Sequence, residues 1–267
     1  MNKLFGFIGI GNMGYAMLKG ASKYFEARKL TYTDISKKRL DWVKSQINID
    51  YLTSNKKCLE SCSIIILAIK PQYYNQVLKN IKDSVKKEHI IISIAPGITI
   101  DAIKQELGND IRIIRAMPNT PALVSEGIST ISYSNDEYSD EERESVKKFF
   151  SSFGEVAEVE EKLMDSVVPI TGSSPAYCFI FIEALADGAV KLGLPRDQAY
   201  KMAAQALFGS AKMVLETGEH PAVLKDQVCS PGGTTIEAVA TLEKNGFRNA
   251  ILEAVNDCYK KCKDLSK

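Results

Sequence analysis

Residues 4–14 read Leu-Phe-Gly-Phe-Ile-Gly-Ile-Gly-Asn-Met-Gly, and this stretch decides the fold of the first half of the chain. The apolar run Leu4–Ile10 predicts a buried strand, and a helix is expected from about Met13 to Phe25. Between them the glycines stand in the spacing G-x-G-x-x-G. Such glycines permit a tight turn and let a pyrophosphate approach the N-terminus of the helix closely. We therefore expect a dinucleotide-binding loop, rather than a glycine-rich turn without a ligand.

The end of the next predicted strand carries an acidic residue. Asp34 lies 20 residues after Gly14, where a carboxylate can accept a hydrogen bond from a ribose 2′-OH and so favour NADH. Lys37, Lys38 and Arg39 follow at once. These cations could neutralise a 2′-phosphate, or they could form a solvated helix face. The sequence thus predicts NADPH or NADH as cofactor and leaves the choice open.

The first half alternates predicted strands and helices. Strands are expected at 4–10, 30–35, 63–69, 89–95, 111–116, 128–133 and 156–159, and helices at 13–25, 37–46, 72–85, 99–107 and 139–153. This order is typical of βαβ units, so the expected fold class is α/β, with a doubly wound Rossmann domain over residues 1–160. Ligands of such sheets bind at the carboxyl ends of the strands. The proline-containing loops 68–71, 95–97 and 117–121 are therefore candidates for the nicotinamide pocket, or simple strand ends.

The pattern changes near Glu160. No convincing strand follows, and prolines and glycines mark the boundaries of helices expected at 176–192, 195–216, 221–228, 235–244 and 247–265. Residues 161–267 are therefore expected to form an all-helical domain. The helix 176–192 is apolar on most sides, and we expect it at a subunit interface rather than in the core of a monomer.

A second glycine-rich turn precedes the helix 235–244. The stretch Gln227–Glu237 reads Gln-Val-Cys-Ser-Pro-Gly-Gly-Thr-Thr-Ile-Glu. Its two successive glycines allow neighbouring N–H groups to point into one concavity, and a helix N-terminus adds unpaired donors. This arrangement suits a small carboxylate. A dinucleotide loop and a carboxylate site together suggest an enzyme that reduces or oxidises a small acid.

Composition and charge narrow the classes of function. With 45% hydrophobic residues, 25% charged residues and a net charge of +1, the chain is expected to be a soluble globular protein without affinity for nucleic acid or an anionic membrane. No apolar run is expected to reach the roughly 20 residues that span a bilayer. The absence of a signal-peptide pattern leads us to expect a cytoplasmic protein. The six cysteines and two histidines lack the spacing of a metal site, so reduced thiols and no bound metal are expected.

Together these segments resemble the pyrroline-5-carboxylate reductase family over essentially the whole chain. The matching segments are 6–14, 115–121, 172–177 and, most specifically, 224–235. The resemblance implies a Rossmann domain followed by a helical dimerisation domain, in a homodimer that assembles to a decamer. It also implies reduction of L-Δ1-pyrroline-5-carboxylate to L-proline by hydride transfer from NAD(P)H, the last step of proline biosynthesis.

The same resemblance implies the site residues. Cofactor contacts fall on Ile8, Gly9, Ile10, Gly11, Asn12, Met13, Asp34, Asn55, Ala68, Ile69, Lys70, Pro71, Pro96 and Gln227, and substrate contacts on Glu161 and the backbone N–H groups of Gly233, Thr234 and Thr235. Pro96, Gln227 and Asp34 depart from the residues that many members carry. Because a protonated imine is already electrophilic, positioning matters more than a strong acid. Thr235 is the candidate catalytic residue, as a hydrogen-bond partner of the ring nitrogen, unless its hydroxyl only caps the helix.

Two other functions fit part of the pattern. A β-hydroxyacid dehydrogenase shares the plan of a Rossmann domain followed by helices, but it needs a proton donor, for which Lys191 is the candidate. A non-catalytic dinucleotide sensor would bind NAD(P)H and have no use for a carboxylate site. Oxidation of NAD(P)H with pyrroline-5-carboxylate, compared with a 3-oxo acid, would separate the three.

Overall fold

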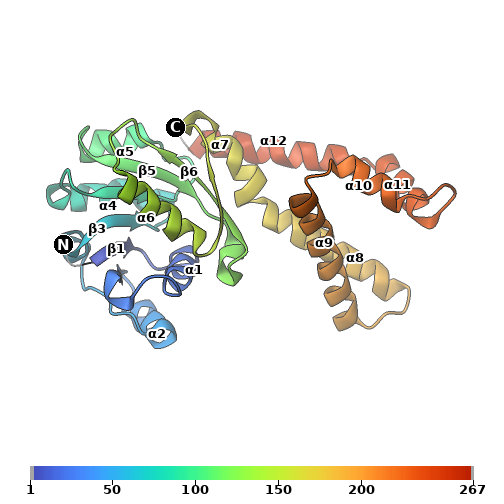
Figure 1. The fold of residues 1–267 in the computed structure, drawn as a ribbon, viewed down its shortest axis with the longest axis horizontal. Coiled ribbons are helices and arrows are strands. Elements are labelled where there is room, and N and C mark those ends of the chain that lie inside the picture. Colours follow the sequence, from blue (N-terminus) through green and yellow to red (C-terminus); the bar gives the residue numbers. More distant parts are fainter. Residues whose placement is uncertain (1–2, 266–267) are drawn as a thin grey trace. The chain divides into compact units, whose positions relative to one another are not determined.

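The computed structural model describes residues 3–265 and divides the chain into two compact units (Figure 1). One unit contains the chain up to Ser173 together with the segment from Asp257 onward, and the other is Ser174–Asn256. The outer ends of the expected domains, at residues 1 and 267, lie outside the described residues. Contacts thus divide the chain at a different place from the expected boundary at 160/161, since residues 161–173 pack with the sheet.

A seven-stranded sheet forms the centre of the first unit, in the order β2-β1-β3-β4-β5-β6-β7. Its strands are β1 (Lys3–Ile8), β2 (Leu30–Thr33), β3 (Cys62–Leu67), β4 (Ile90–Ser93), β5 (Arg112–Met117), β6 (Gly127–Tyr133) and β7 (Gly154–Glu158). The α/β fold class is confirmed. All neighbours are parallel except β5 and β6. That antiparallel pair was not foreseen; its connection, residues 118–126, is too short for a parallel crossover.

Helices cover both faces of this sheet, because residues of each strand alternate between two apolar clusters. Phe5, Phe7 and Ile66 face one cluster, while Ile8 and Leu67 face the other. The first cluster is closed by α1 (Asn12–Ala21), α2 (Lys37–Ile47) and α6 (Asp140–Ser151), and the second by α3 (Asn55–Ser61), α4 (Tyr74–Ile81) and α5 (Ile100–Leu107). Helix α3 was not predicted, and the helix expected at 72–85 is shortened to α4 between two 3₁₀ turns.

Residues 161–173 form a series of short helical turns that sequence reasoning missed. They are the 3₁₀ turn η5 (Glu161–Leu163), α7 (Met164–Val167) and the π-helical η6 (Val168–Gly172). The π-turn ends with the N–H of Ser173 bonded to the carbonyl of Val168 at 2.9 Å. An ion pair between Asp165 of α7 and Arg115 of β5 holds these turns to the sheet unit.

The second unit is built from α8 (Ser174–Lys191), α9 (Arg196–Thr217), α10 (Pro221–Val228), α11 (Thr234–Lys244) and the first part of α12 (Phe247–Leu265). Among the residues that the structure describes, no strand follows β7, as the sequence predicted. Gly193 and Gly218 end α8 and α9 with positive φ angles of +100° and +66°, a backbone conformation that glycine adopts without strain.

The helical run Glu161–Lys191 is, by length and composition alone, long and apolar enough to cross a membrane. The expectation that no such segment exists was therefore wrong. Pro169, Gly172 and two serines interrupt the apolar sequence without ending the helix, because η6 carries the chain across them. Helices buried in the core of a soluble protein pass the same test of length and composition.

Candidate functional site

The glycine-rich loop after β1 is closed by two of its three glycines. Gly9 has φ +92°, and a Cβ there would lie 2.5 Å from the carbonyl oxygen of Ala68. A Cβ on Gly14 would lie 2.7 Å from the carbonyl oxygen of Gly9. Both glycines therefore serve the packing of the loop against α1 and the end of β3.

Gly11 is different, because nothing in the chain occupies the space beside it. A Cβ on Gly11 would meet no atom within 4 Å, and its φ of −62° is accessible to any residue. It stands at the N-cap of α1 and forms no side-chain cap, so the first N–H groups of the helix are left for another acceptor. An open glycine before an uncapped helix N-terminus fits a bound pyrophosphate.

A cavity of about 440 Å³ lies at the carboxyl ends of the parallel strands, beside the glycine-rich loop. It is lined by Gly11, Asn12, Met13, Ala68, Ile69, Lys70, Ile94, Ala95, Pro96, Met117, Pro118, Val168, Gly172 and Ser173. The structure thus brings together the dinucleotide loop and parts of the three loops that sequence reasoning singled out. Ile8, Gly9, Ile10, Asp34, Asn55 and Pro71 are outside this lining.

The far wall of the cavity contains residues that sequence reasoning did not assign to a site. Val168, Gly172 and Ser173 come from η6 and the residue after it. Asn119 ties this wall to the sheet: its side-chain amide donates to the carbonyl of Thr171 at 3.0 Å and accepts from the N–H of Ile128 at 2.9 Å. The available signal was the glycine and serines at 172–174, which interrupt an otherwise apolar helix.

Asp34 and Arg39 both bind to the backbone of the glycine-rich loop. The Asp34 carboxylate accepts from the N–H groups of Ile10, at 2.8 Å, and Ser36, at 2.9 Å. The Arg39 guanidinium donates to the carbonyl of Ile10 at 2.7 Å and lies 4.3 Å from the ring centre of Trp42. Among the three basic residues 37–39, Arg39 therefore contacts the glycine-rich loop.

The two lysines of the basic run lie elsewhere. Lys37 pairs with Asp41 at 2.7 Å and also contacts the Tyr51 hydroxyl, and Lys38 is exposed. The side-chain bond from Asp41 raises the pKa of Lys37 above its ordinary value. Asn55 is the half-buried first residue of α3, directly after the capping residue Ser54.

Glu161 has partners within the sheet unit. Its carboxylate accepts from the N–H of Ile100, the first residue of α5, at 2.6 Å, and lies 3.7 Å from the guanidinium of Arg115. Glu161 therefore satisfies a helix N-terminus that follows the Pro96 loop. A contact with substrate stays a prediction.

The second glycine-rich turn differs in one respect from the expected geometry. The positive φ, +67°, belongs to Gly232, whereas Gly233 has φ −79°. The N–H of Gly233 donates to the carbonyl of Ser230 at 3.0 Å. This N–H therefore takes part in closing the turn, and a contact of Gly233 with a carboxylate stays a prediction.

Thr234 and Thr235 stand at the start of a helix, and their contact with a substrate stays a prediction. They are the first two residues of α11, whose N-cap Gly233 provides no side-chain cap. N–H groups at these positions have no acceptor within the helix and suit an anion. Thr235 is half-buried, while Gln227, on the last turn of α10, is exposed.

The cysteines and histidines give no sign of a metal site, and within residues 3–265 no group of three potential ligands is found. Cys58 and Cys62 are buried beside Gly6, where a Cβ would lie 2.5 and 2.7 Å from their sulfur atoms. His89 is buried, accepts from the N–H of Lys86 at Nδ1 and contacts the carbonyl of Leu59 through Nε2. Its side chain thus has a structural role.

Comparison with known proteins identifies the family. A model described as pyrroline-5-carboxylate reductase dimerisation matches residues 161–265, and one described as NADP oxidoreductase, coenzyme F420-dependent, matches residues 4–97. Over 270 residues the chain is 47% identical to the pyrroline-5-carboxylate reductase of Escherichia coli (strain K12), with 100% of both covered. The chain belongs to the pyrroline-5-carboxylate reductase family.

Other pyrroline-5-carboxylate reductases agree with this assignment. The enzyme of Methanosarcina acetivorans is 39% identical over 268 residues, covering 100% of this chain and 99% of the relative. The solved structure of the Plasmodium falciparum pyrroline carboxylate reductase with NADP bound matches with a TM-score of 0.91 at 34% identity, covering 100% and 99% of the two chains. The Rossmann fold and the helical region are thus those of this family.

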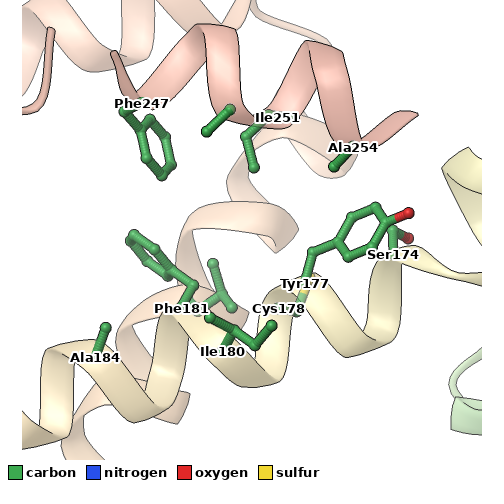
Figure 2. A pocket seen from close by; sticks show the side chains of 11 residues that line it. Ser174, Tyr177, Cys178, Ile180, Phe181, Ala184, Phe247, Ile251 and Ala254 are labelled. Atoms are coloured by element: carbon green, nitrogen blue, oxygen red, sulfur yellow. The ribbon is translucent and has the colours of Figure 1, made fainter. Parts of the chain in front are cut away.

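In a pyrroline-5-carboxylate reductase the helical unit is the dimerisation region, and its surface fits that role. Phe179 and Ile180 of α8 are 62% and 66% exposed. An apolar groove of about 610 Å³ lies within the unit. Figure 2 shows Phe247 and Ile251 on one wall of this groove, facing Tyr177 and Phe181 on the other. A monomer rarely leaves so much apolar surface exposed, so the chain is built for an oligomer.

The lysine of the alternative enzyme class does not occupy a catalytic environment. Lys191 is the exposed last residue of α8. A cation in the last turn of a helix interacts favourably with the helix dipole, which accounts for it without a reaction.

Proposed function

We propose that this chain reduces L-Δ1-pyrroline-5-carboxylate to L-proline with NAD(P)H, as the last step of proline biosynthesis. The observation that carries the proposal is the full-length identity of 47% to a pyrroline-5-carboxylate reductase. The chain supplies both halves of the required site: a dinucleotide loop with an open Gly11, and a helix N-terminus at Thr234 and Thr235. A dinucleotide sensor would need only the first.

The cofactor would lie along the carboxyl edge of the sheet. We assign its contacts to Ile8–Met13, Asp34, Asn55, Ala68–Pro71, Pro96 and Gln227, and we add Arg39 because it reaches the loop. When bound, the reduced nicotinamide supplies a hydride. The proline-fixed loops and the wall from Val168 to Ser173 would hold and orient the ring, and positioning of this kind is a large part of catalysis.

The substrate is a cyclic imine that carries a carboxylate. The backbone N–H groups of Thr234 and Thr235 would hold the carboxylate, so that the imine carbon is presented for hydride transfer. The Thr235 hydroxyl would accept a hydrogen bond from the N–H of the protonated ring nitrogen and serve as a conduit for that proton. Glu161 would contribute by holding Ile100 behind the Pro96 loop, whether or not it reaches the substrate.

The assembly we infer is a homodimer that associates further to a decamer, in the cytoplasm, without nucleic acid, membrane or metal as partner. The exposed apolar residues of α8 and the groove in Figure 2 support a protein partner for this surface. A second copy of the same chain is the partner that the dimerisation model implies.

One assay tests the activity. Purified protein would be given NADH or NADPH with pyrroline-5-carboxylate, and in parallel with a 3-oxo acid. We expect oxidation of the cofactor and formation of proline with the imine only, unchanged by a chelator. Turnover of the 3-oxo acid would favour the β-hydroxyacid dehydrogenase class, and cofactor binding without any turnover would favour a sensor.

A further inference from the structure

Tyr74 joins the ends of two neighbouring strands through one buried hydroxyl. It is the first residue of α4 and is 1% exposed. The hydroxyl donates to the carbonyl of Leu67 at 2.9 Å and lies 3.0 Å from the Ser93 hydroxyl. Leu67 and Ser93 are the last residues of β3 and β4, and they are paired in the register of the sheet. The phenol therefore bridges these strands at their carboxyl edge.

Both strands continue directly into walls of the cavity. Ala68–Lys70 follow Leu67, and Ile94–Pro96 follow Ser93. The backbone amide groups of Ile94 and Ala95 also approach the phenol oxygen. Burial raises the pKa of Tyr74 to about 12, so the hydroxyl stays protonated and able to donate at neutral pH. Its position thus sets the spacing between the two loops.

We propose that Tyr74 is a positioning residue for the dinucleotide: its hydroxyl fixes the Ala68–Lys70 loop relative to the Ile94–Pro96 loop, between which the nicotinamide end of the cofactor is held. The inference rests on the proposed function of this cavity as the cofactor site. Tyr74 does not line the cavity itself, so it acts through the two backbone segments and not by touching the ligand.

The chain offers a matched control. Tyr138 donates to the carbonyl of Ile113 at 2.9 Å and lies 2.8 Å from the Ser134 hydroxyl, so its partners are of the same two kinds as those of Tyr74, a strand carbonyl and a serine hydroxyl. Burial raises the pKa of Tyr138 to about 12 as well. Ile113 lies near the amino end of β5, whereas the cavity is lined by Met117 at the other end of that strand. Tyr138→Phe therefore removes a similar bond away from the site.

The experiment compares full-length Tyr74→Phe, Tyr138→Phe and the unchanged protein by melting temperature, by fluorescence titration with NADPH and NADH, and by steady-state kinetics. We expect both variants to melt a few degrees lower than the unchanged protein, by similar amounts. Only Tyr74→Phe should raise the Kd and KM for the dinucleotide, by about 3- to 10-fold, the value of one hydrogen bond. The KM for pyrroline-5-carboxylate should not change.

A second variant keeps the test decisive if Tyr74→Phe does not fold. Ser93→Ala removes one partner of the phenol and should weaken dinucleotide binding in the same direction, by a smaller factor. Equal dinucleotide affinity in Tyr74→Phe and Tyr138→Phe, or in Ser93→Ala and the unchanged protein, would overturn the inference and leave the proposed function standing. Failure of the unchanged protein to bind NADPH or NADH would overturn both.

Discussion

The carboxylate of Asp34 accepts a hydrogen bond from the backbone N–H of Ile10, inside the dinucleotide loop, across 2.8 Å. This bond fastens the end of β2 to the turn that would receive the pyrophosphate. Each carboxylate oxygen keeps a further lone pair for a ribose hydroxyl. A 2′-phosphate would instead bring a second negative charge to the same place, where Arg39 reaches the loop.

The choice between the two dinucleotides should therefore depend on Asp34. Asp34→Ser removes the negative charge, and we expect the ratio of kcat/KM for NADPH to that for NADH to rise about tenfold, equivalent to about 1.4 kcal/mol. Arg39→Ala should lower the same ratio. Steady-state kinetics with both cofactors measures it; a ratio that Asp34→Ser leaves unchanged would show that Asp34 does not discriminate.

Two glycines of the loop should respond in opposite ways to the same substitution. Gly11→Ala adds a methyl group that meets no atom within 4 Å, so the melting temperature should hold while dinucleotide affinity falls. Gly14→Ala places the methyl group 2.7 Å from the Gly9 carbonyl oxygen and should destabilise the fold. Thermal melts and cofactor titration separate the two effects. Unchanged affinity in Gly11→Ala would mean that the open space beside it holds no ligand.

The turn before α11 should control the substrate and not the cofactor. Thr235→Ala keeps the backbone N–H and removes the hydroxyl; losing one hydrogen bond to a charged group costs about 1.5–3 kcal/mol, or roughly a 10- to 150-fold fall in kcat/KM. Gly233→Val should be worse, because a Cβ there would lie 2.4 Å from the Ser230 hydroxyl and 3.0 Å from its carbonyl oxygen. Both variants should bind NAD(P)H normally. Near-normal turnover in Gly233→Val would show that this turn does not hold the carboxylate.

Assembly should depend on the exposed face of α8. A charge at Phe179, which is 62% exposed, should prevent apolar contact with a second copy and give inactive monomers. Tyr24→Asp, at a position 60% exposed in the sheet unit, is the control and should stay oligomeric. Light scattering and activity at one protein concentration provide the comparison, and active monomers of Phe179→Asp would separate assembly from catalysis.

The ion pair of Asp165 should make the free energy of unfolding depend on pH in the acid range. Burial alone would raise the pKa of Asp165, but its bonds to Arg115 and Lys263 outweigh burial and hold the pKa below its ordinary value. Asp165→Asn removes the nearer carboxylate from the Arg115 charge, which is 1% exposed, and leaves Glu161 at 3.7 Å; it should cost up to about 3–5 kcal/mol at pH 7.

The sign of the pH effect follows from the lowered pKa. A carboxyl group whose folded pKa is lowered stabilises the fold above its unfolded pKa of about 3.9 and loses that effect as the pH falls through the folded value. The difference between the unchanged protein and Asp165→Asn in urea denaturation should thus be constant between about pH 5 and 7 and shrink below about pH 4. A difference that does not change with pH would exclude an ionised Asp165 as its source.

The sequence predicted those parts of the fold that local rules decide. The loop at 9–14, the alternation of strands and helices in a doubly wound sheet and the helices beyond residue 174 follow from periodicity, glycine spacing and capping residues. The segment 161–173 did not, because a π-helical turn has no periodic signal of its own. The strands β5 and β6 were placed, but their antiparallel pairing depends on the length of the link between them.

The part of the candidate site on loops at strand ends was predictable, because the loops that follow parallel strands lie at the same edge of the sheet. The wall from Val168 to Ser173 could not be found that way, because Asn119 and the π-turn place it from a distant part of the chain. At Gly232 and Gly233 the composition predicted a turn, but composition does not say which glycine takes the positive φ.

The uncovered apolar side of α8 makes the stability of this protein a property of its concentration. Because dilution favours monomers over oligomers, it should lower the unfolding midpoint by mass action. Where two versions of the gene are expressed together, both products would enter the same particles.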